Sequence, residues 1–118
     1  MASMMAPSLA VGAAGLELAI GAAGGTRLRT ALVGVVAGIL DERLDPADAV
    51  ERPRFHRAGG VVNTEPGVDE NALADLESSG LQVRRWPGRH HYFGGVSLLA
   101  LRGAAGDPRR SGRAAILR

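Results

Sequence analysis

The sequence predicts an α+β fold of short strands with two or three helices. Three observations support this prediction: apolar runs bounded by glycine, one long apolar stripe at helical spacing, and two Asp residues placed to start further helices. The 118 residues suffice for one compact domain and show no internal repeat or linker, so we expect a single domain over 1–118. With 17 Gly and only four aromatic side chains, the core depends on Leu, Val and Ile, which indicates a domain that packs against further protein.

The N-terminal part has the pattern of a β-hairpin. Residues 8–11 and 16–20 are apolar runs, and the link between them has glycine at both ends, which suits a tight turn. The mostly apolar run 96–101 is typical of a strand buried on both faces. We expect no regular structure from Gly103 onward. The remaining predicted strands are short and lie between turn residues: 54–57, 61–64 and 81–85.

The longest predicted helix starts near Thr26. Its large apolar side chains recur at spacings of four, three and four and so share one face: Leu28, Leu32, Val35 and Ile39. A second stripe on the same helix consists of Ala31, Gly34 and Gly38. Gly in a helix interior costs on the order of 1 kcal/mol relative to Ala, so this stripe predicts that another backbone, such as a sheet, approaches closely. We expect this helix to be buried on most of its circumference.

Two shorter helices are predicted from their first residues. One begins after Asp45, with proline at its first position, and ends near Arg52 because Pro53 disfavours helical conformation in the residue before it. The other runs from Asp69 through residue 79, where glycine follows.

Composition and charge exclude several function classes. The excess of Lys+Arg over Asp+Glu is only 14 − 12 = 2, and the cations, all Arg, are interleaved with acids, so we expect no nucleic-acid partner. The longest apolar run, 31–40, is about half a membrane span, and Glu17 interrupts the apolar N-terminal stretch. We therefore expect no membrane partner and a cytoplasmic chain. The absence of Cys excludes disulfides and thiolate metal sites.

Residues 21–27, Gly-Ala-Ala-Gly-Gly-Thr-Arg, lie between a predicted strand and the long helix. Glycine leaves main-chain N–H groups unobstructed, and a helix start adds positive potential. Such a turn can bind a phosphate or the oxyanion of an acyl-transfer intermediate. Thr26 and Arg27 stand where a nucleotide-binding P-loop needs its Lys. An ordinary strand–helix turn remains the alternative.

The other ionisable residues favour structural roles. His56, His90 and His91 have no Asp, Glu or Cys at ligand spacing beside them, so we expect no metal site. No G-x-S-x-G motif supports a Ser–His–Asp triad. We expect Asp107 to form an ion pair within a turn, and Arg54 to be a structural cation.

Several segments, taken in order, resemble the γ-glutamyltransferase (γ-glutamyltranspeptidase) family. Residues 3–8 are similar to its S-S-M-x-P-T stretch, and residues 21–27 to its G-S-P-G-G-S-R segment. Residues 45–56, which end in A-V-x-x-P-R-F-H, resemble its D-x-x-x-x-P-x-x-A-V-x-x-P-R-x-H region. Residues 92–95 and 103–109 are similar to the Y-F-G-G-V strand and the G-A-x-D-P-R end of bacterial members. The ordered set spans nearly the whole chain.

The resemblance implies an N-terminal-nucleophile hydrolase, in which a precursor cleaves itself and a freed Thr attacks the γ-glutamyl amide. It implies that residues 1–118 are the C-terminal segment of the small subunit and part of an αββα sandwich, without the large subunit or the nucleophile-bearing segment. By this resemblance Gly24 and Gly25 would offer backbone N–H groups to the oxyanion. Ser3 would contact the γ-glutamyl carboxylate, and Met4 stands where the family has a second serine.

The implied activity is transfer or hydrolysis of γ-glutamyl groups from substrates such as glutathione. No metal or organic cofactor is implied, because the amine of the nucleophile acts as its own base. No Thr precedes Ser3, so we expect the chain alone to be inactive and to need the missing large-subunit or upstream segment as its partner. A β-lactam or amide acylase on the same scaffold is the alternative enzyme, favoured if Met4 marks a pocket without a carboxylate site. A non-catalytic remnant or interaction module is the alternative outside enzymes.

Overall fold

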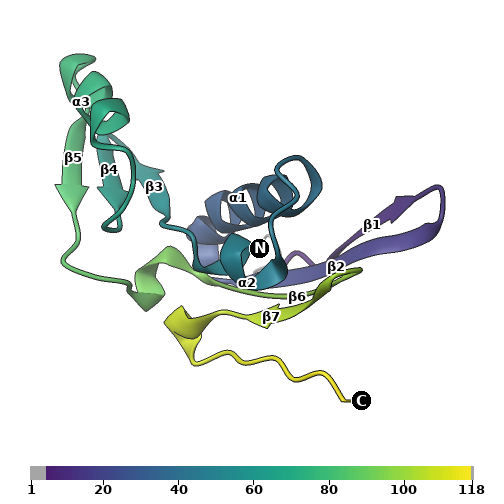
Figure 1. Cartoon of the computed structure of the whole chain (residues 1–118). Coiled ribbons are helices and arrows are strands. Elements are labelled where there is room, and N and C mark those ends of the chain that lie inside the picture. The colour runs from purple at the N-terminus through teal and green to yellow at the C-terminus, as the bar shows by residue number, and fades with distance from the viewer. Residues whose placement is uncertain (1–4, 118) are drawn as a thin grey trace.

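The computed structural model describes residues 5–117, which form two sheets and three α-helices (Figure 1). The α+β prediction is confirmed. Three single-turn 3-10 helices connect the regular elements: η1 (Gly25–Arg27), η2 (His91–Phe93) and η3 (Pro108–Arg110). The helices and strands in chain order are β1 (Ser8–Gly12), β2 (Gly15–Ala23), α1 (Leu28–Leu40), α2 (Pro46–Glu51), β3 (Phe55–Ala58), β4 (Val61–Thr64), α3 (Glu70–Ser78), β5 (Gln82–Arg85), β6 (Gly95–Ala100) and β7 (Gly103–Gly106).

The larger sheet is antiparallel, with strand order β1-β2-β6-β7. The predicted hairpin is confirmed, since β1 pairs with β2 and Gly12 lies opposite Gly15. The expectation of irregular structure from Gly103 onward is wrong, because β7 pairs with β6 from Gly103 opposite Ala100 to Gly106 opposite Ser97. Gly-Ala-Ala-Gly has no side-chain alternation, so this strand depends on the neighbouring backbone rather than on local propensity.

Helices α1 and α2 cover one face of the larger sheet (Figure 1). The core between them is aliphatic, as the composition predicts. Its larger members come from alternate positions of β2 and β6 and from one face of α1: Leu18, Ile20, Val96, Leu98, Leu28, Val35 and Ile39.

The opposite face of the larger sheet is open. Leu99 of β6 is 64% exposed and Leu9 of β1 is 70% exposed. The predicted burial of 96–101 on both faces is therefore wrong for this chain. Within residues 5–117, only the irregular C-terminal segment runs along that side, where Arg113, Ala114 and Ala115 help to line a groove.

The smaller sheet, β3-β4-β5, forms with α3 a lobe beside α1 (Figure 1). Strands β3 and β4 are antiparallel, whereas β4 and β5 are parallel and connected through α3. The carboxylate of Asp69 accepts a hydrogen bond from the Asn71 N–H at 3.0 Å, so the predicted start of α3 is confirmed.

Helix α1 is only partly buried. At Gly38 an added Cβ would lie 3.2–3.3 Å from side-chain atoms of Arg52, Ala49 and Leu44, so side chains in and beside α2, rather than the backbone of a sheet, fill the space there. At Gly34 an added Cβ would meet nothing within 4 Å, and Val33 is 70% exposed, so burial on most of the circumference is wrong. No helix among residues 5–117 has both the length and the apolar character needed to cross a membrane.

Candidate active site

The turn between β2 and α1 is built on two glycines. Gly24 has φ 140° and Gly25 has φ 61°, conformations that side-chain-bearing residues rarely adopt. The N–H of Arg27 donates to the carbonyl of Gly24 at 3.2 Å and closes the turn. Helix α1 begins at Leu28 behind η1, two residues later than the predicted start at Thr26.

Within residues 5–117, neither the Gly24 nor the Gly25 N–H donates any of the hydrogen bonds of turns, loops and caps, and both residues are half-buried. They stand next to the N-terminus of α1, whose first turn holds no acidic residue. Adjacent main-chain donors at a helix start are suited to an anion or to a developing oxyanion.

A second glycine segment packs directly on this turn. A Cβ added at Gly24 would lie 2.7 Å from the Cα of Gly94, so the two backbones touch and neither position has room for a side chain. Gly94 also has a positive φ of 79°. The G-A-A-G-G-T-R and Y-F-G-G motifs, far apart in sequence, therefore meet at one point.

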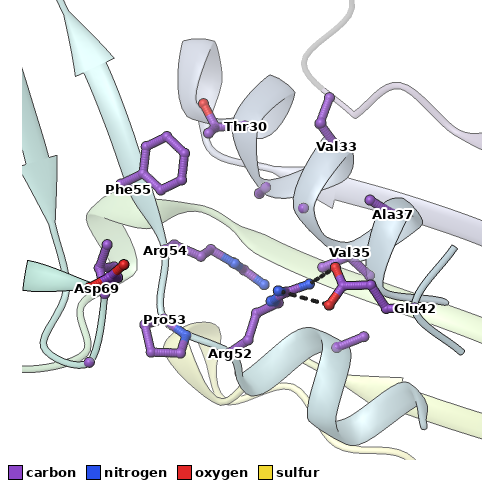
Figure 2. Close-up of a pocket in the computed structure, with 15 residues that line it drawn as sticks. Thr30, Val33, Val35, Ala37, Glu42, Arg52, Pro53, Arg54, Phe55 and Asp69 are labelled. Atoms are coloured by element: carbon purple, nitrogen blue, oxygen red, sulfur yellow. Dashed lines mark hydrogen bonds and ion pairs between the residues drawn. The ribbon is translucent and has the colours of Figure 1, made fainter. Parts of the chain in front are cut away.

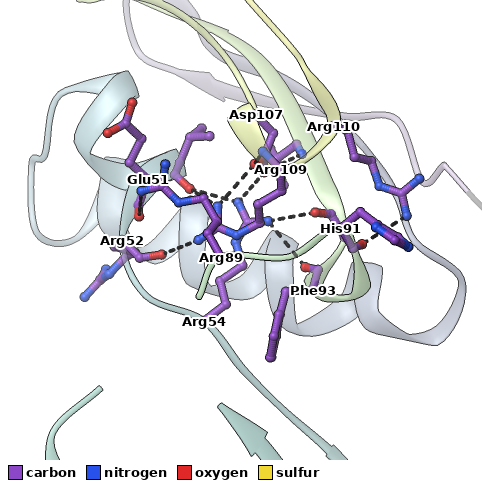
Figure 3. A network of polar contacts seen from close by, with 12 residues as sticks. Glu51, Arg52, Arg54, Arg89, His91, Phe93, Asp107, Arg109 and Arg110 are labelled. Atoms are coloured by element: carbon purple, nitrogen blue, oxygen red, sulfur yellow. Dashed lines mark hydrogen bonds and ion pairs between the residues drawn. The ribbon is translucent and has the colours of Figure 1, made fainter. Parts of the chain in front are cut away.

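Four consecutive carbonyls, those of residues 91–94, accept hydrogen bonds from arginine side chains. Arg110 donates to the first at 3.3 Å, and Arg27 donates to the second at 3.1 Å. Arg54 donates to the third and fourth, each at 3.3 Å. Figure 3 shows the side chains of Arg54 and Arg110 beside this segment. These three arginines come from different parts of the chain and fix the backbone that contacts Gly24.

A buried network of ion pairs lies next to residues 91–94 (Figure 3). Arg54 pairs with Asp107 at 2.7 Å, and Arg109 pairs with Glu65 at 2.6 Å and with Asp107 at 3.2 Å. The expectations that Arg54 is structural and that Asp107 is ion-paired in a turn are confirmed. Glu65 was not predicted, and its only signal is an acid placed directly after the predicted strand 61–64.

The same charged groups also bind the main chain. Asp107 accepts a hydrogen bond from the Val96 N–H at 3.0 Å, and Glu65 accepts one from the Arg54 N–H at 2.9 Å. Burial lowers the pKa of Arg54 despite the attraction of Asp107. Burial also opposes the charge of Arg109, but hydrogen bonds and attraction from Glu65 and Asp107 prevail and raise its pKa. The network therefore joins the start of β6 to the ends of β4 and α2.

The three histidines do not gather into a metal site. His56 Nδ1 lies 2.7 Å from Thr30 Oγ1, and burial, together with the charges of Arg27 and Arg29, lowers the pKa of His56. The rings of His90 and His91 lie 4.1 Å apart at the start of η2. No group of three or more His, Cys, Asp or Glu in the described part of the chain could hold a metal ion.

Two cavities lie near the Gly24–Gly25 turn, but neither extends to it. One of about 400 Å³ lies between α1 and the chain at Arg52 to Phe55, with the 2.8 Å ion pair of Arg52 and Glu42 on its edge (Figure 2). The other, about 740 Å³, follows the open face of the larger sheet. Neither is lined by Gly24 or Gly25, and Ser3 and Met4 lie outside the described residues.

Comparison with known proteins gives a family and a fold. The family model described as Gamma-glutamyltranspeptidase matches residues 1–117. A gamma-glutamyltranspeptidase from Pseudomonas nitroreducens, complexed with L-DON, superposes with a TM-score of 0.80 at 22% identity, over 100% of this chain and 64% of that one. The transpeptidase enzyme CapD of Bacillus anthracis gives 0.82 at 24% identity, over 98% of this chain and 72% of that one. These likenesses show that the chain shares its fold with part of both transpeptidase structures.

Acylases are similar too. The Acylase ACY 1 proenzyme of Pseudomonas sp. (strain V22) is 31% identical over 96 residues, which are 81% of this chain and 17% of that protein. A cephalosporin acylase from Bacillus halodurans has a TM-score of 0.71 at 21% identity, over 85% of this chain and 20% of that one. The chain thus spans about a sixth of the length of the curated relatives it matches.

Proposed function

The chain belongs to the gamma-glutamyltranspeptidase family, and on that basis we propose that it is the C-terminal segment of the small subunit of an enzyme that transfers or hydrolyses γ-glutamyl groups. Its own contribution is the oxyanion site. The observation that carries this proposal is the turn at Gly24 and Gly25, whose two N–H groups donate none of the turn, loop and cap hydrogen bonds among residues 5–117 while the backbone rests on Gly94.

The proposed chemistry is stabilisation of charge. The hydroxyl oxygen of the nucleophile attacks the γ-carbonyl carbon and gives its proton to the amine of the same Thr. The π electrons of the carbonyl move onto its oxygen, and the Gly24 and Gly25 amides donate hydrogen bonds to that oxyanion. A donor held in place before the reaction requires no reorganisation, and losing one typically lowers the rate by about 10²–10³-fold. By the same resemblance, Ser3 contacts the γ-glutamyl carboxylate, and Met4 removes the second hydroxyl from that contact.

The attacking Thr is proposed to come from outside this chain. Thr26, Thr30 and Thr64 all lie within folded segments, and none is a freed N-terminus. The open face of the larger sheet, with Leu9 and Leu99 exposed over a groove, is where the second layer of the sandwich would dock. We therefore propose that the chain turns over substrate only with the large subunit and the nucleophile-bearing segment.

The test supplies the large subunit and the nucleophile-bearing segment, and it removes one main-chain N–H donor from the turn. The chain is assembled with an upstream segment carrying the large subunit and the Thr, and cleavage of a γ-glutamyl anilide is measured. Replacing Gly25 by glycolate exchanges its N–H for an ester oxygen and leaves the backbone shape unchanged. We expect kcat to fall by about 10²–10³-fold.

The matched control places the same ester at Gly88, a loop position where an added Cβ would meet nothing within 4 Å. This control should retain the parent rate. An equal rate for both esters would contradict the oxyanion role, and an inactive parent assembly would contradict the proposed activity.

A second candidate is an acylase that cleaves an amide or β-lactam side chain without a γ-glutamyl carboxylate. Two observations favour it: the curated relatives at 31% and 29% identity are acylases, and Met4 replaces the second serine. Profiling the assembled enzyme on γ-glutamyl and butyryl anilides separates the two, because only the γ-glutamyl group carries the carboxylate and the α-amine. Inactivity on both would favour a non-catalytic module.

A further inference from the structure

Arg27 holds the candidate turn and the neighbouring segment at once. Its backbone N–H closes the turn on the Gly24 carbonyl, while its side-chain Nε donates to the Tyr92 carbonyl at 3.1 Å. Its guanidinium also lies over the Tyr92 ring, 4.7 Å from the ring centroid. One residue therefore connects the two segments on either side of the Gly24–Gly94 contact.

The partner of Arg27 is itself fixed. The Tyr92 ring stacks on Trp86 with centroids 4.8 Å apart and planes at 20°. Trp86 in turn donates its indole N–H to the side-chain oxygen of Asn63, a buried residue of β4, at 3.0 Å. The guanidinium thus rests on a support that extends to the smaller sheet, which makes it a rigid anchor for the turn.

The Gly94 side of the Gly24–Gly94 contact is also fixed. Arg54 binds the carbonyls of Phe93 and Gly94 and is itself paired with the buried Asp107. With the Tyr92–Gly94 backbone fixed from behind, the position of the turn depends on the link that Arg27 makes. Without that link, the side-chain hydrogen bond between the turn and residues 91–94 is lost, and the contact of Gly24 with the Gly94 backbone remains.

Resting on the proposed oxyanion role, we infer that Arg27 is a positioning residue: its guanidinium, held on Tyr92, fixes the direction in which the Gly24 and Gly25 N–H groups point. Arginine suits this role because its planar group can stack on a ring and donate a directed hydrogen bond together, which the compact lysine ammonium cannot do. Arg27 acts through the turn and does not contact the substrate.

Arg29 provides a matched control for charge. It lies two residues further along, at the start of the same helix, and is exposed. In the described part of the chain, it forms none of the hydrogen bonds or ion pairs that hold residues 91–94. Arg29→Gln removes the same charge from the same region without touching the link to Tyr92.

The experiment compares Arg27→Gln, Arg27→Lys and Arg29→Gln in the assembled enzyme described above. We expect Arg27→Gln to lower kcat by about 10- to 100-fold, as a small misplacement of catalytic groups does, with KM changed by less than about twofold. Arg27→Lys retains charge and chain length and should recover only part of the rate. Arg29→Gln should match the parent. Equal losses for Arg27→Gln and Arg29→Gln, or a loss confined to KM, would overturn the inference.

A second readout does not depend on turnover. With ¹⁵N-glycine in this chain, the Gly24 and Gly25 amide resonances of the assembled enzyme should shift in Arg27→Gln and stay in place in Arg29→Gln. If the parent assembly does not cleave γ-glutamyl anilide, the proposed function fails, and these resonances still decide whether Arg27 positions the turn. Unmoved Gly24 and Gly25 resonances in both Arg27 variants would refute the positioning role. If Arg27→Gln does not assemble, the cleavage rate and the glycine amide resonances are measured in Arg27→Lys instead.

Discussion

The side chain of Arg109 is fully enclosed and surrounded by acceptors. It binds both acids of the buried network and also donates to the Val50 and Arg52 carbonyls at 2.8 and 2.9 Å. Arg109 and its acceptor Val50 lie 59 positions apart in the sequence. At the scale of single residues, Arg109 is thus a cross-link between α2, β4 and the C-terminal part of the chain.

Arg109→Gln should therefore be strongly destabilising. It leaves Glu65 without its guanidinium partner in a buried site, and removing one member of a buried pair costs about 3–5 kcal/mol. The free energy of unfolding is measured by urea titration, with the fluorescence of Trp86, the one Trp of the chain, as the signal.

Arg85→Gln is the control. Arg85 pairs with Glu70 and Glu77 at 2.9 Å each on the surface, where both acids remain solvated after the substitution. Its urea midpoint should stay at that of the parent. Similar midpoints for the two variants would mean that the buried network contributes no net stability.

The elements differ in how far the sequence predicts them. The hairpin, α2 and α3 were predictable because the glycine link, the proline at the start of α2 and the Asp69 cap of α3 act locally, although the Asp45 side chain makes no cap hydrogen bond. Strand β7 was not, because Gly103–Gly106 carries no alternation and forms only beside β6. The site shows the same division: the Gly24–Gly25 turn is visible as a motif, whereas its contact with Gly94 and the pair Glu65–Arg109 depend on long-range packing.

The two glycines of α1 allow an element-scale prediction. Both lie in the helix interior, where Gly→Ala stabilises by about 1 kcal/mol if the methyl group has room. At Gly34 it meets nothing within 4 Å, whereas at Gly38 it would lie 3.2–3.3 Å from Arg52, Ala49 and Leu44. Gly34→Ala should raise the free energy of unfolding, and Gly38→Ala should leave it unchanged or lower it. Equal gains at both positions would contradict the packing of α1 on α2.

At the scale of the whole molecule, the dominant feature is a sheet covered by helices on one face only. The apolar run 96–101 predicts burial on both faces, but among the described residues Leu99 stays 64% exposed on the open face. An apolar sheet face of this kind is expected to associate with other protein.

Leu99→Lys tests this face. It places a charge at an exposed position, so the far-ultraviolet circular dichroism of the chain should be unchanged, while assembly with the upstream segment, followed by size-exclusion chromatography, should be lost. Ala72→Lys on the exposed side of α3 is the control and should assemble normally. Normal assembly of Leu99→Lys would show that the open face is not the docking surface.

The surface shape of the open sheet face constrains the protein layer that packs on it. The strip along β2 is shallow, since it presents Ala19 and Gly21, whereas Leu9 of β1 and Leu99 of β6 stand higher on either side of it. A complementary layer must therefore carry its bulkiest side chains opposite the shallow stretch and its smallest opposite the two leucines. Such a pattern of sizes can be sought directly in candidate upstream sequences.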